Sequence, residues 1–264
     1  GARGMQSHFG LQEQSLGAAP LISRGTDASK SGIQEVVAMF EDFSWRQPEE
    51  IFAERRKPKP AMALGGGMPM GNAPMTGGTM SMARGGGTNM ASGGEAMKAD
   101  LNDVTYDAYL ANDRAFADPE VIQVEKGAHV RLRLINGSAS SNFMVEFDGV
   151  EVTLLTVDGN PVAPLKLSAL PLGIAQRADV MLRMPDDGRA IPVVARGEGR
   201  TLQPGVLLRP IGATVKKVPT NGAMAAPAVG LSREKELRAS EPLANRPVDR
   251  SVPIELTGNM GAYI

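Results

Sequence analysis

The sequence predicts an all-β fold, in which antiparallel strands form a β-sandwich and a long Gly/Met-rich linker interrupts the chain. Three observations support this prediction. Apolar and polar residues alternate strictly in the middle of the chain, which is the pattern of half-buried strands. Turn-forming residues recur there about every 8–12 positions, as in sandwich folds. One segment changes abruptly in composition and shows no hydrophobic period, as expected for a linker.

The strongest strand pattern lies between residues 121 and 159. At every second position an apolar side chain would face the core: Val130, Leu132 and Leu134. Arg131 and Arg133 would face the other way, and we expect that face to be solvated. Two more alternating stretches follow around 143–147 and 152–156. We interpret the three strands, joined by tight turns, as the middle of an antiparallel sandwich.

Further strand patterns complete a sandwich of seven or more strands over residues 99–212. Strand character is expected at Val104, Tyr106 and Ala108, and a turn at 111–113. Later strands are expected at 165–167, 178–182, 191–195 and 206–208. A segment of about 110 residues is the size of one such domain. We therefore expect it to fold as one independent unit.

In the segment before the linker, residues 1–56, the sequence pattern predicts strands near the beginning and over 36–43, followed by a short helix. We expect the strand over 36–43 to lead out of a first unit into a connector. Pro48, Glu49 and Glu50 suit a first helical turn, where the fixed φ of proline and acidic side chains are favourable. We interpret the two acids as helix-entry residues and not as catalytic carboxylates.

The linker, residues 57–98, is rich in glycine and methionine. Eight methionines lie in it: Met62, Met68, Met70, Met75, Met80, Met82, Met90 and Met97. Thioethers are soft ligands that select Cu(I), so one interpretation is a weak copper-collecting segment. The other is a flexible spacer. Both interpretations remain open at this point.

Composition excludes several functions. The chain has no cysteine, so disulfides and thiolate metal sites, including a blue-copper centre, are impossible within its 264 residues. A formal net charge of −1 gives no electrostatic basis for binding nucleic acid or an anionic membrane, and no apolar window is long enough to span one. His8 and His129 are the only histidines. His129 has no second ligand near it in the sequence, so we expect no metal role for it.

Four motifs resemble the multicopper oxidase family, in particular its copper-resistance and laccase-like bacterial branch. They read SHFGLQEQSLGAAPLI, VRLRLIN, VDGNPVAP and VPIELTGNM. The resemblance implies cupredoxin-like Greek-key sandwiches and an internal fragment centred on the second cupredoxin domain. Residues 1–56 would hold the C-terminal end of the first domain and a connector, and 57–98 the flexible linker. Residues 99–212 would form the second domain, and 213–264 a connector and the first strand of a third.

The first of these motifs implies a metal ligand at His8. In the family, a His-x-His pair on a strand supplies ligands to a trinuclear copper cluster, and residues i and i+2 of a strand share one face. Here His8 occupies the second position and Gln6 the first. The resemblance therefore implies His8 as the metal ligand and copper as its metal. It implies no catalytic residue within this chain.

The resemblance also implies a function: oxidation of phenols or metal ions, coupled to reduction of O₂ to water, in copper resistance or homeostasis. The partners would be copper ions and a small-molecule or metal-ion electron donor, and the location periplasmic or secreted. This segment would mainly be the structural middle domain, and we expect no oxidase activity from it alone, because the cysteine and most histidines are absent. The alternatives are a non-enzymatic copper-binding or scaffolding module that uses the Met-rich linker, and an inert domain of a larger assembly.

Overall fold

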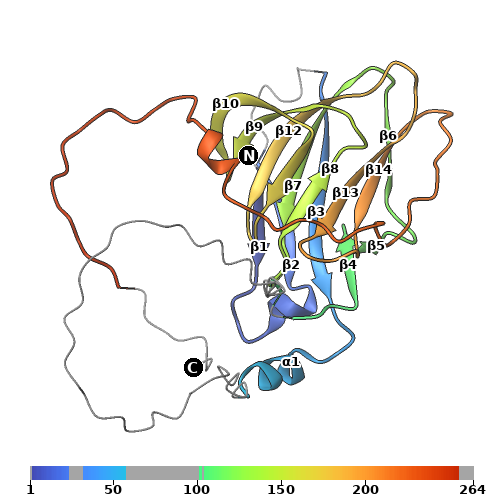
Figure 1. Cartoon of the computed structure of the whole chain (residues 1–264). Coiled ribbons are helices and arrows are strands. Elements are labelled where there is room, and N and C mark those ends of the chain that lie inside the picture. The colour runs from blue at the N-terminus through green and yellow to red at the C-terminus, as the bar shows by residue number, and fades with distance from the viewer. Residues whose placement is uncertain (1, 24–31, 58–100, 103, 256–264) are drawn as a thin grey trace, which may run out of the picture.

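Two β-sheets packed face to face, with a two-stranded hairpin outside the larger one, form the architecture (Figure 1). The computed structural model describes residues 2–23, 32–57, 101–102 and 104–255. The larger sheet runs β10 (Asn160–Leu167), β9 (Val152–Val157), β12 (Arg177–Arg183), β7 (His129–Asn136), β3 (Gln34–Phe43), β4 (Ala108–Ala111) and β5 (Arg114–Ala115). The smaller sheet runs β11 (Ala169–Leu172), β8 (Phe143–Glu146), β13 (Ile191–Gly197), β14 (Gly205–Pro210) and β6 (Val121–Val124).

The hairpin and three short helices complete the described elements. β1 (Ala2–Gln6) pairs antiparallel with β2 (Ala18–Ile22). The helices are η1 (Gln12–Ser15), α1 (Pro48–Arg55) and η3 (Glu234–Glu236). In α1, Glu49 and Glu50 lie in the first turn, as predicted.

The core lies between the two sheets, and the predicted core face of β7 is confirmed. Val130, Leu132 and Leu134 are all fully buried. Phe143 and Phe147 fill the core from the opposite sheet and are buried to the same extent. The three strands expected in the middle therefore do lie there. They are not neighbours in one sheet, because β8 belongs to the smaller sheet while β7 and β9 both pair with β12.

Two tight turns follow directly from the sequence. Asn112 and Asp113 adopt φ angles of 50° and 62° between β4 and β5. Asp158 and Gly159, at 51° and 81°, connect β9 to β10 in the same way. Two consecutive residues with positive φ are the mark of the two-residue hairpin turn whose twist matches that of the strands.

The strand expected over 36–43 occupies an interior position that the sequence pattern does not predict. It is β3, which lies parallel to β7 on one side and antiparallel to β4 on the other. Val36, Ala38 and Phe40 are buried in the sandwich core. The sandwich thus includes a strand that precedes the linker, and residues 99–212 share their larger sheet with it.

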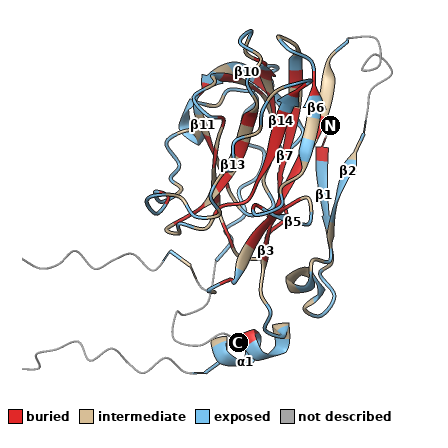
Figure 2. Ribbon diagram, turned by 90° about the vertical axis from the view of Figure 1, so that its right-hand side faces the viewer, coloured by how far each residue is buried: buried red, intermediate tan, exposed pale blue. Residues whose placement is uncertain are grey.

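The prediction that Arg131 and Arg133 lie on a solvated face is wrong for Arg133. The Arg133 side chain is 3% exposed, and its Nη1 and Nη2 lie 2.8 Å from Asp179 Oδ2 and 2.5 Å from Glu35 Oε1. The reason is that the outer face of the larger sheet is partly covered by the β1–β2 hairpin (Figure 2). Arg131 is 32% exposed, and its Nη1 lies 3.8 Å from Glu35 Oε1.

Two expected segments are only partly described. The Gly/Met-rich linker lies outside the described residues, apart from Lys57. The strand expected to open a third domain covers 252–260, of which residues 252–255 belong to no strand and the rest lies outside the described part. The chain after β14 crosses back over the sandwich and bridges to β10 through the pair Val162 and Ala239.

Candidate functional site

His8, the predicted metal ligand, lies just after β1, at the start of the loop that leads to β2. Its side chain is exposed to solvent. Its Nε2 lies 3.3 Å from Nε2 of Gln6, so the two side chains meet on one face, as their spacing of two predicts. A carboxamide thus stands beside the imidazole at the position where the family motif has its first histidine.

The loop that carries His8 is held by its own hydrogen bonds. Ser7 N donates to Gly17 O at 2.9 Å, and Gly17 N donates to Gln12 O at 2.8 Å. Leu16 adopts a left-handed conformation with φ 60° at the end of η1. A Cβ on Gly17 would lie 2.5 Å from Gln12 O, so only glycine fits there. The loop therefore presents His8 from a defined turn.

A polar network ties this loop to the sandwich. Gln14 Nε2 donates to the Tyr106 hydroxyl at 3.0 Å, and that hydroxyl lies 2.8 Å from Ser140 Oγ. Asp42, at the end of β3, accepts hydrogen bonds from the backbone N–H groups of Ala139 and Ser140, both at 3.0 Å. The residues following β7 and the His8 loop are thereby joined at one end of the sandwich.

Burial affects the ionisation of this network. It raises the pKa of the Tyr106 hydroxyl above its ordinary value, and the nearby Asp42 carboxylate adds to the effect. Burial also raises the pKa of Asp42, against the hydrogen bonds that favour its charged form. At the loop, burial raises the pKa of Glu13 although the charge of His8 opposes this. Tyr106 thus stays neutral near neutral pH and acts as a hydrogen-bonding anchor.

The donor set around His8 does not form a complete copper site by itself. Neutral imidazole suits copper, but a carboxamide is a poor copper ligand. Among the residues that the structure describes, no three His, Cys, Asp or Glu side chains are grouped so that they could hold a metal ion. His129 opens β7, at the end opposite the loop that the His8 segment contacts. The structure therefore does not bring the two histidines together.

Sequence reasoning did not identify Glu41, which lies on the outer face of β3. The residue is 3% exposed, and it lines a cavity of about 200 Å³ between the β1–β2 hairpin and the turn at Asn112 and Asp113. Asn112 and Asp113 of that turn line the same cavity. Burial, and after it the charges of Asp113 and Asp42, raise the pKa of Glu41 to about 7. The sequence feature that could have indicated Glu41 is the presence of acidic residues within the otherwise apolar strand AMFEDF, residues 38–43.

Replacing Glu41 by Gln is expected to stabilise the fold, increasingly so as the pH rises. A carboxyl whose pKa is raised by folding from 4.5 to about 7 holds its proton more tightly in the folded state. The folded state of the natural protein is therefore destabilised as the pH rises from about 4.5 to about 7. Glutamine does not ionise, so the variant does not undergo this destabilisation. We expect a gain on the order of 2 kcal/mol above pH 7, reduced by solvent screening at the cavity, and almost none below pH 4.5.

Urea unfolding at a series of pH values measures this effect. Glu125→Gln is the matched control, because it removes the same charge from an exposed turn. A gain for Glu41→Gln that does not depend on pH would show that ionisation of Glu41 is not its cause.

Comparisons with known proteins agree with this fold. The family model described as multicopper oxidase matches residues 83–214, half of the chain. Multicopper oxidase MmcO of Mycobacterium tuberculosis is 28% identical over 205 residues, which are 76% of this chain and 37% of that protein. Copper resistance protein A of Escherichia coli is 31% identical over 103 residues, 39% of this chain and 16% of that protein.

Solved structures give the same architecture. Fet3p, described as a multicopper oxidase that functions in iron import, has a TM-score of 0.58 at 10% identity and covers 83% of this chain and 36% of its own. A laccase from Botrytis aclada has a TM-score of 0.54 at 20% identity, with coverages of 85% and 37%. At these identities the likeness shows the fold alone, a cupredoxin-like β-sandwich.

The sandwich and the matched family model define the class of protein. The chain belongs to the multicopper oxidase family, whose metal is copper. It spans less than two fifths of the length of the two relatives described above. Among the described residues, none of the helices has both the length and the apolar character needed to cross a lipid bilayer.

Proposed function

We propose that this chain is part of a laccase-like multicopper oxidase of the copper-resistance type. Such an oxidase would couple oxidation of phenols or metal ions to reduction of O₂ to water, and serve copper resistance or homeostasis. The observation that carries the proposal is the multicopper oxidase match over 83–214, which spans most of the sandwich. The name of the second relative, copper resistance protein A, supports this branch and a periplasmic or secreted location.

Within that enzyme we assign the sandwich a structural role. The sandwich would correspond to the second cupredoxin domain. Strands β1 and β2 would belong to the end of the first domain, and residues 213–264 would connect to a third. The metal-ligand content supports this assignment, because the sequence has no cysteine and only two histidines. The residues of this chain would then hold neighbouring domains in position, and oxidase activity would require ligands in addition to its own.

We further propose His8 as a copper ligand whose remaining partners come from outside the described residues. Its exposure supports this role, since an exposed imidazole on a fixed turn is free to meet ligands from another segment. Asp42, Tyr106 and Gln14 would keep the turn in place through the network that joins it to the sandwich. We assign no reaction step to these residues.

Cu(II) titration of the whole chain, followed by electron paramagnetic resonance, tests the role of His8. We expect a weak site with nitrogen coupling that disappears in His8→Ala and persists in His129→Ala, the matched control whose imidazole is also exposed. Gln6→His is expected to raise the Cu(II) affinity at least tenfold, because it adds a second imidazole on the same face. Equal loss of binding in both alanine variants would contradict the assignment.

A second candidate function is a non-enzymatic copper-binding module that uses the linker. The observation that favours it is the density of methionine, since eight of the chain's 15 lie in residues 57–98. These residues lie outside the described part of the chain, so the proposal depends on composition and thioether chemistry. It requires no ligand from the sandwich.

Competition for Cu(I) against a chromogenic chelator tests this second function. Replacing the eight linker methionines by Leu is expected to abolish the competition, because leucine keeps the apolar volume and removes the thioether. The control replaces the exposed methionines Met5 and Met224, which lie outside the linker and are 56% and 74% exposed. Undiminished competition by the linker variant would identify residues 57–98 as a spacer.

A further inference from the structure

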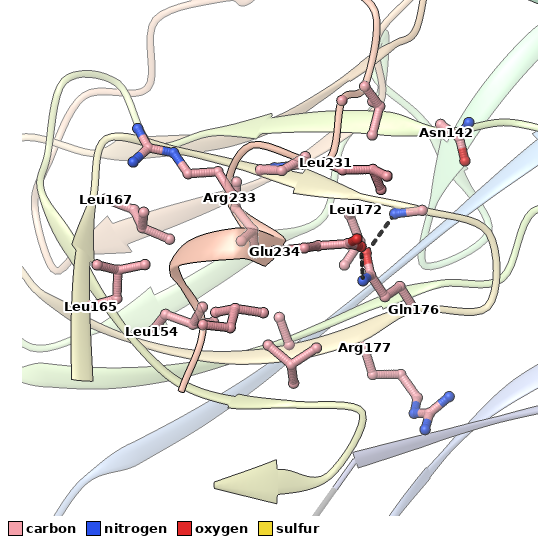
Figure 3. A pocket seen from close by; sticks show the side chains of 18 of the residues that line it. Asn142, Leu154, Leu165, Leu167, Leu172, Gln176, Arg177, Leu231, Arg233 and Glu234 are labelled. Carbon is pink, nitrogen blue, oxygen red and sulfur yellow. Dashed lines mark hydrogen bonds between the residues drawn. The ribbon is translucent and has the colours of Figure 1, made fainter. Parts of the chain in front are cut away.

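A cavity of about 350 Å³ opens at one edge of the sandwich, where β9, β10 and β12 of the larger sheet face β11 of the smaller (Figure 3). Its floor is made mainly of leucine side chains: Leu154, Leu165, Leu167, Leu170 and Leu172. The volume is within the range of small-molecule sites, and it would hold about ten non-hydrogen atoms. The proposed copper chemistry does not involve this cavity, although Val157, the first residue of the motif VDGNPVAP, lines it.

The roof of the cavity is a strap, residues 226–240, that is fixed at both ends. At its start, Ala226 N donates to Arg200 O at 2.9 Å and Val229 N donates to Glu198 Oε1 at 2.5 Å. At its end, Ala163 N of β10 donates to Arg238 O at 2.8 Å. The strap therefore stays over the cavity although it contains only one turn of helix, η3.

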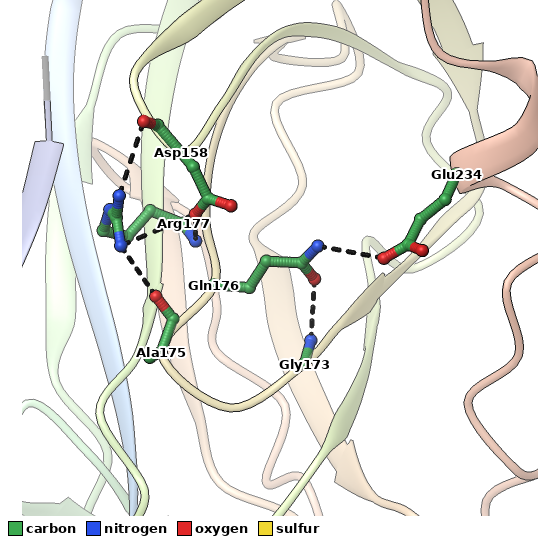
Figure 4. Close-up of polar contacts among 6 residues, drawn as sticks. All are labelled: Asp158, Gly173, Ala175, Gln176, Arg177 and Glu234. Carbon is green, nitrogen blue, oxygen red and sulfur yellow. Dashed lines mark hydrogen bonds and ion pairs between the residues drawn. The ribbon is translucent and has the colours of Figure 1, made fainter. Parts of the chain in front are cut away.

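The middle of the strap is held much less firmly than its ends. Gln176 Nε2 donates to Glu234 Oε1 at 3.3 Å, and Gly173 N in turn donates to Gln176 Oε1 at 2.8 Å (Figure 4). Leu231 lines the cavity yet remains 65% exposed. A large apolar side chain exposed beside an apolar cavity is a surface that a ligand would cover.

The polar groups at the mouth restrict the chemistry of a ligand. Arg177 turns its guanidinium away from the cavity, toward Asp158 and Ala175 O, and Arg233 pairs with Glu236 at 3.0 Å. Both guanidinium groups thus have carboxylate partners, and the described residues that line the cavity include no other positive side chain to receive an anion. Among the described residues, Oε2 of Glu234 receives no hydrogen bond, so the mouth offers one free acceptor.

We propose that this cavity is a binding site for a small uncharged molecule that is apolar over most of its surface and carries one hydroxyl or N–H group. The apolar part would lie on the leucine floor and beneath Leu231. The hydroxyl or N–H would donate to Glu234 at the mouth. A charged ligand is disfavoured, because the floor has no polar group to replace its hydration.

Fluorine NMR on the full chain tests the site with 4-fluorobenzyl alcohol and its hydroxyl-free analogue 4-fluorotoluene. We expect saturable binding of both, with the alcohol bound about fivefold more tightly because of one hydrogen bond. Glu234→Ala is expected to remove this difference and leave the affinity for fluorotoluene unchanged. Absence of saturable binding up to the solubility limit of the probes would overturn the proposal.

Two blocking variants locate the binding. Val157→Phe adds volume to the cavity wall, and Gly173→Val adds a side chain at the mouth. A Cβ at residue 173 would have Gln176 Oε1 at 3.5 Å and Asn142 Oδ1 at 3.8 Å as its nearest contacts. Each is expected to weaken both probes at least tenfold. Ile211→Ala, which changes a 78% exposed residue outside the cavity, serves as the control. Unchanged binding in a blocking variant with a normal melting temperature would place the probes elsewhere and refute the site.

Discussion

Leu132→Asp is expected to unfold the sandwich or to cost more than about 4 kcal/mol, a large part of the stability of a typical domain. Leu132 is fully buried and lies between Val36 of β3 and Val180 of β12 in the larger sheet. An aspartate there would place a carboxylate against the core with no partner. The far-ultraviolet circular dichroism melt and a urea titration measure the loss.

The neighbouring substitution Arg131→Ser is the control for this experiment. It changes the adjacent residue of the same strand, whose side chain is 32% exposed and lies 3.8 Å from Glu35. We expect a change within roughly 0.5 kcal/mol, because partly exposed ion pairs contribute little. Similar losses for the two variants would show that the core face of β7 has been assigned incorrectly.

Arg133→Leu is expected to cost about 3–5 kcal/mol, because it leaves two carboxylates behind in a poorly hydrated place. Asp179 and Glu35 are 6% and 12% exposed, and both contact the Arg133 guanidinium. Asp179→Leu alone should also destabilise, since it leaves the Arg133 cation with a single partner. Urea denaturation of each variant at neutral pH measures these costs.

The double variant Arg133→Leu/Asp179→Leu distinguishes the contribution of the ion pair to stability from that of the apolar contacts made by the same two side chains. It removes one charge of each sign and leaves Glu35 with Arg131, at 3.8 Å. We expect the pair of substitutions to cost less than either one alone, because no unpaired charge remains. Additive losses would indicate that the side chains act through their apolar contacts and not through their charges.

The core of the fold could be predicted from the sequence because alternation specifies which residues share a face. Val130, Leu132 and Leu134 were assigned correctly in this way. The same alternation assigned Arg133 to solvent, because a period of two does not reveal what covers the second face. Its partners Glu35 and Asp179 come from strands far away in the sequence, so no local pattern indicates the buried ion pairs.

The candidate site was predicted only in part, for a similar reason. The spacing of Gln6 and His8 placed them on one face, and their side chains do meet. The anchoring of their loop depends on Gln14, Tyr106 and Asp42, which three separate segments contribute. The alternation around Tyr106 indicated a strand, whereas β4 begins at Ala108 and the tyrosine contributes to a polar network instead.

The interior position of β3 has a consequence for the order in which the protein folds. β3 pairs with β7 on one side and β4 on the other, and both follow the linker in the sequence. At ordinary rates of synthesis of about 5–20 residues per second, the 85 residues between β3 and β7 take about 4–17 s to be added. Until β4 is synthesised β3 has neither of its neighbours, and until β7 follows it has only one, so its apolar side chains stay unpacked during this part of synthesis.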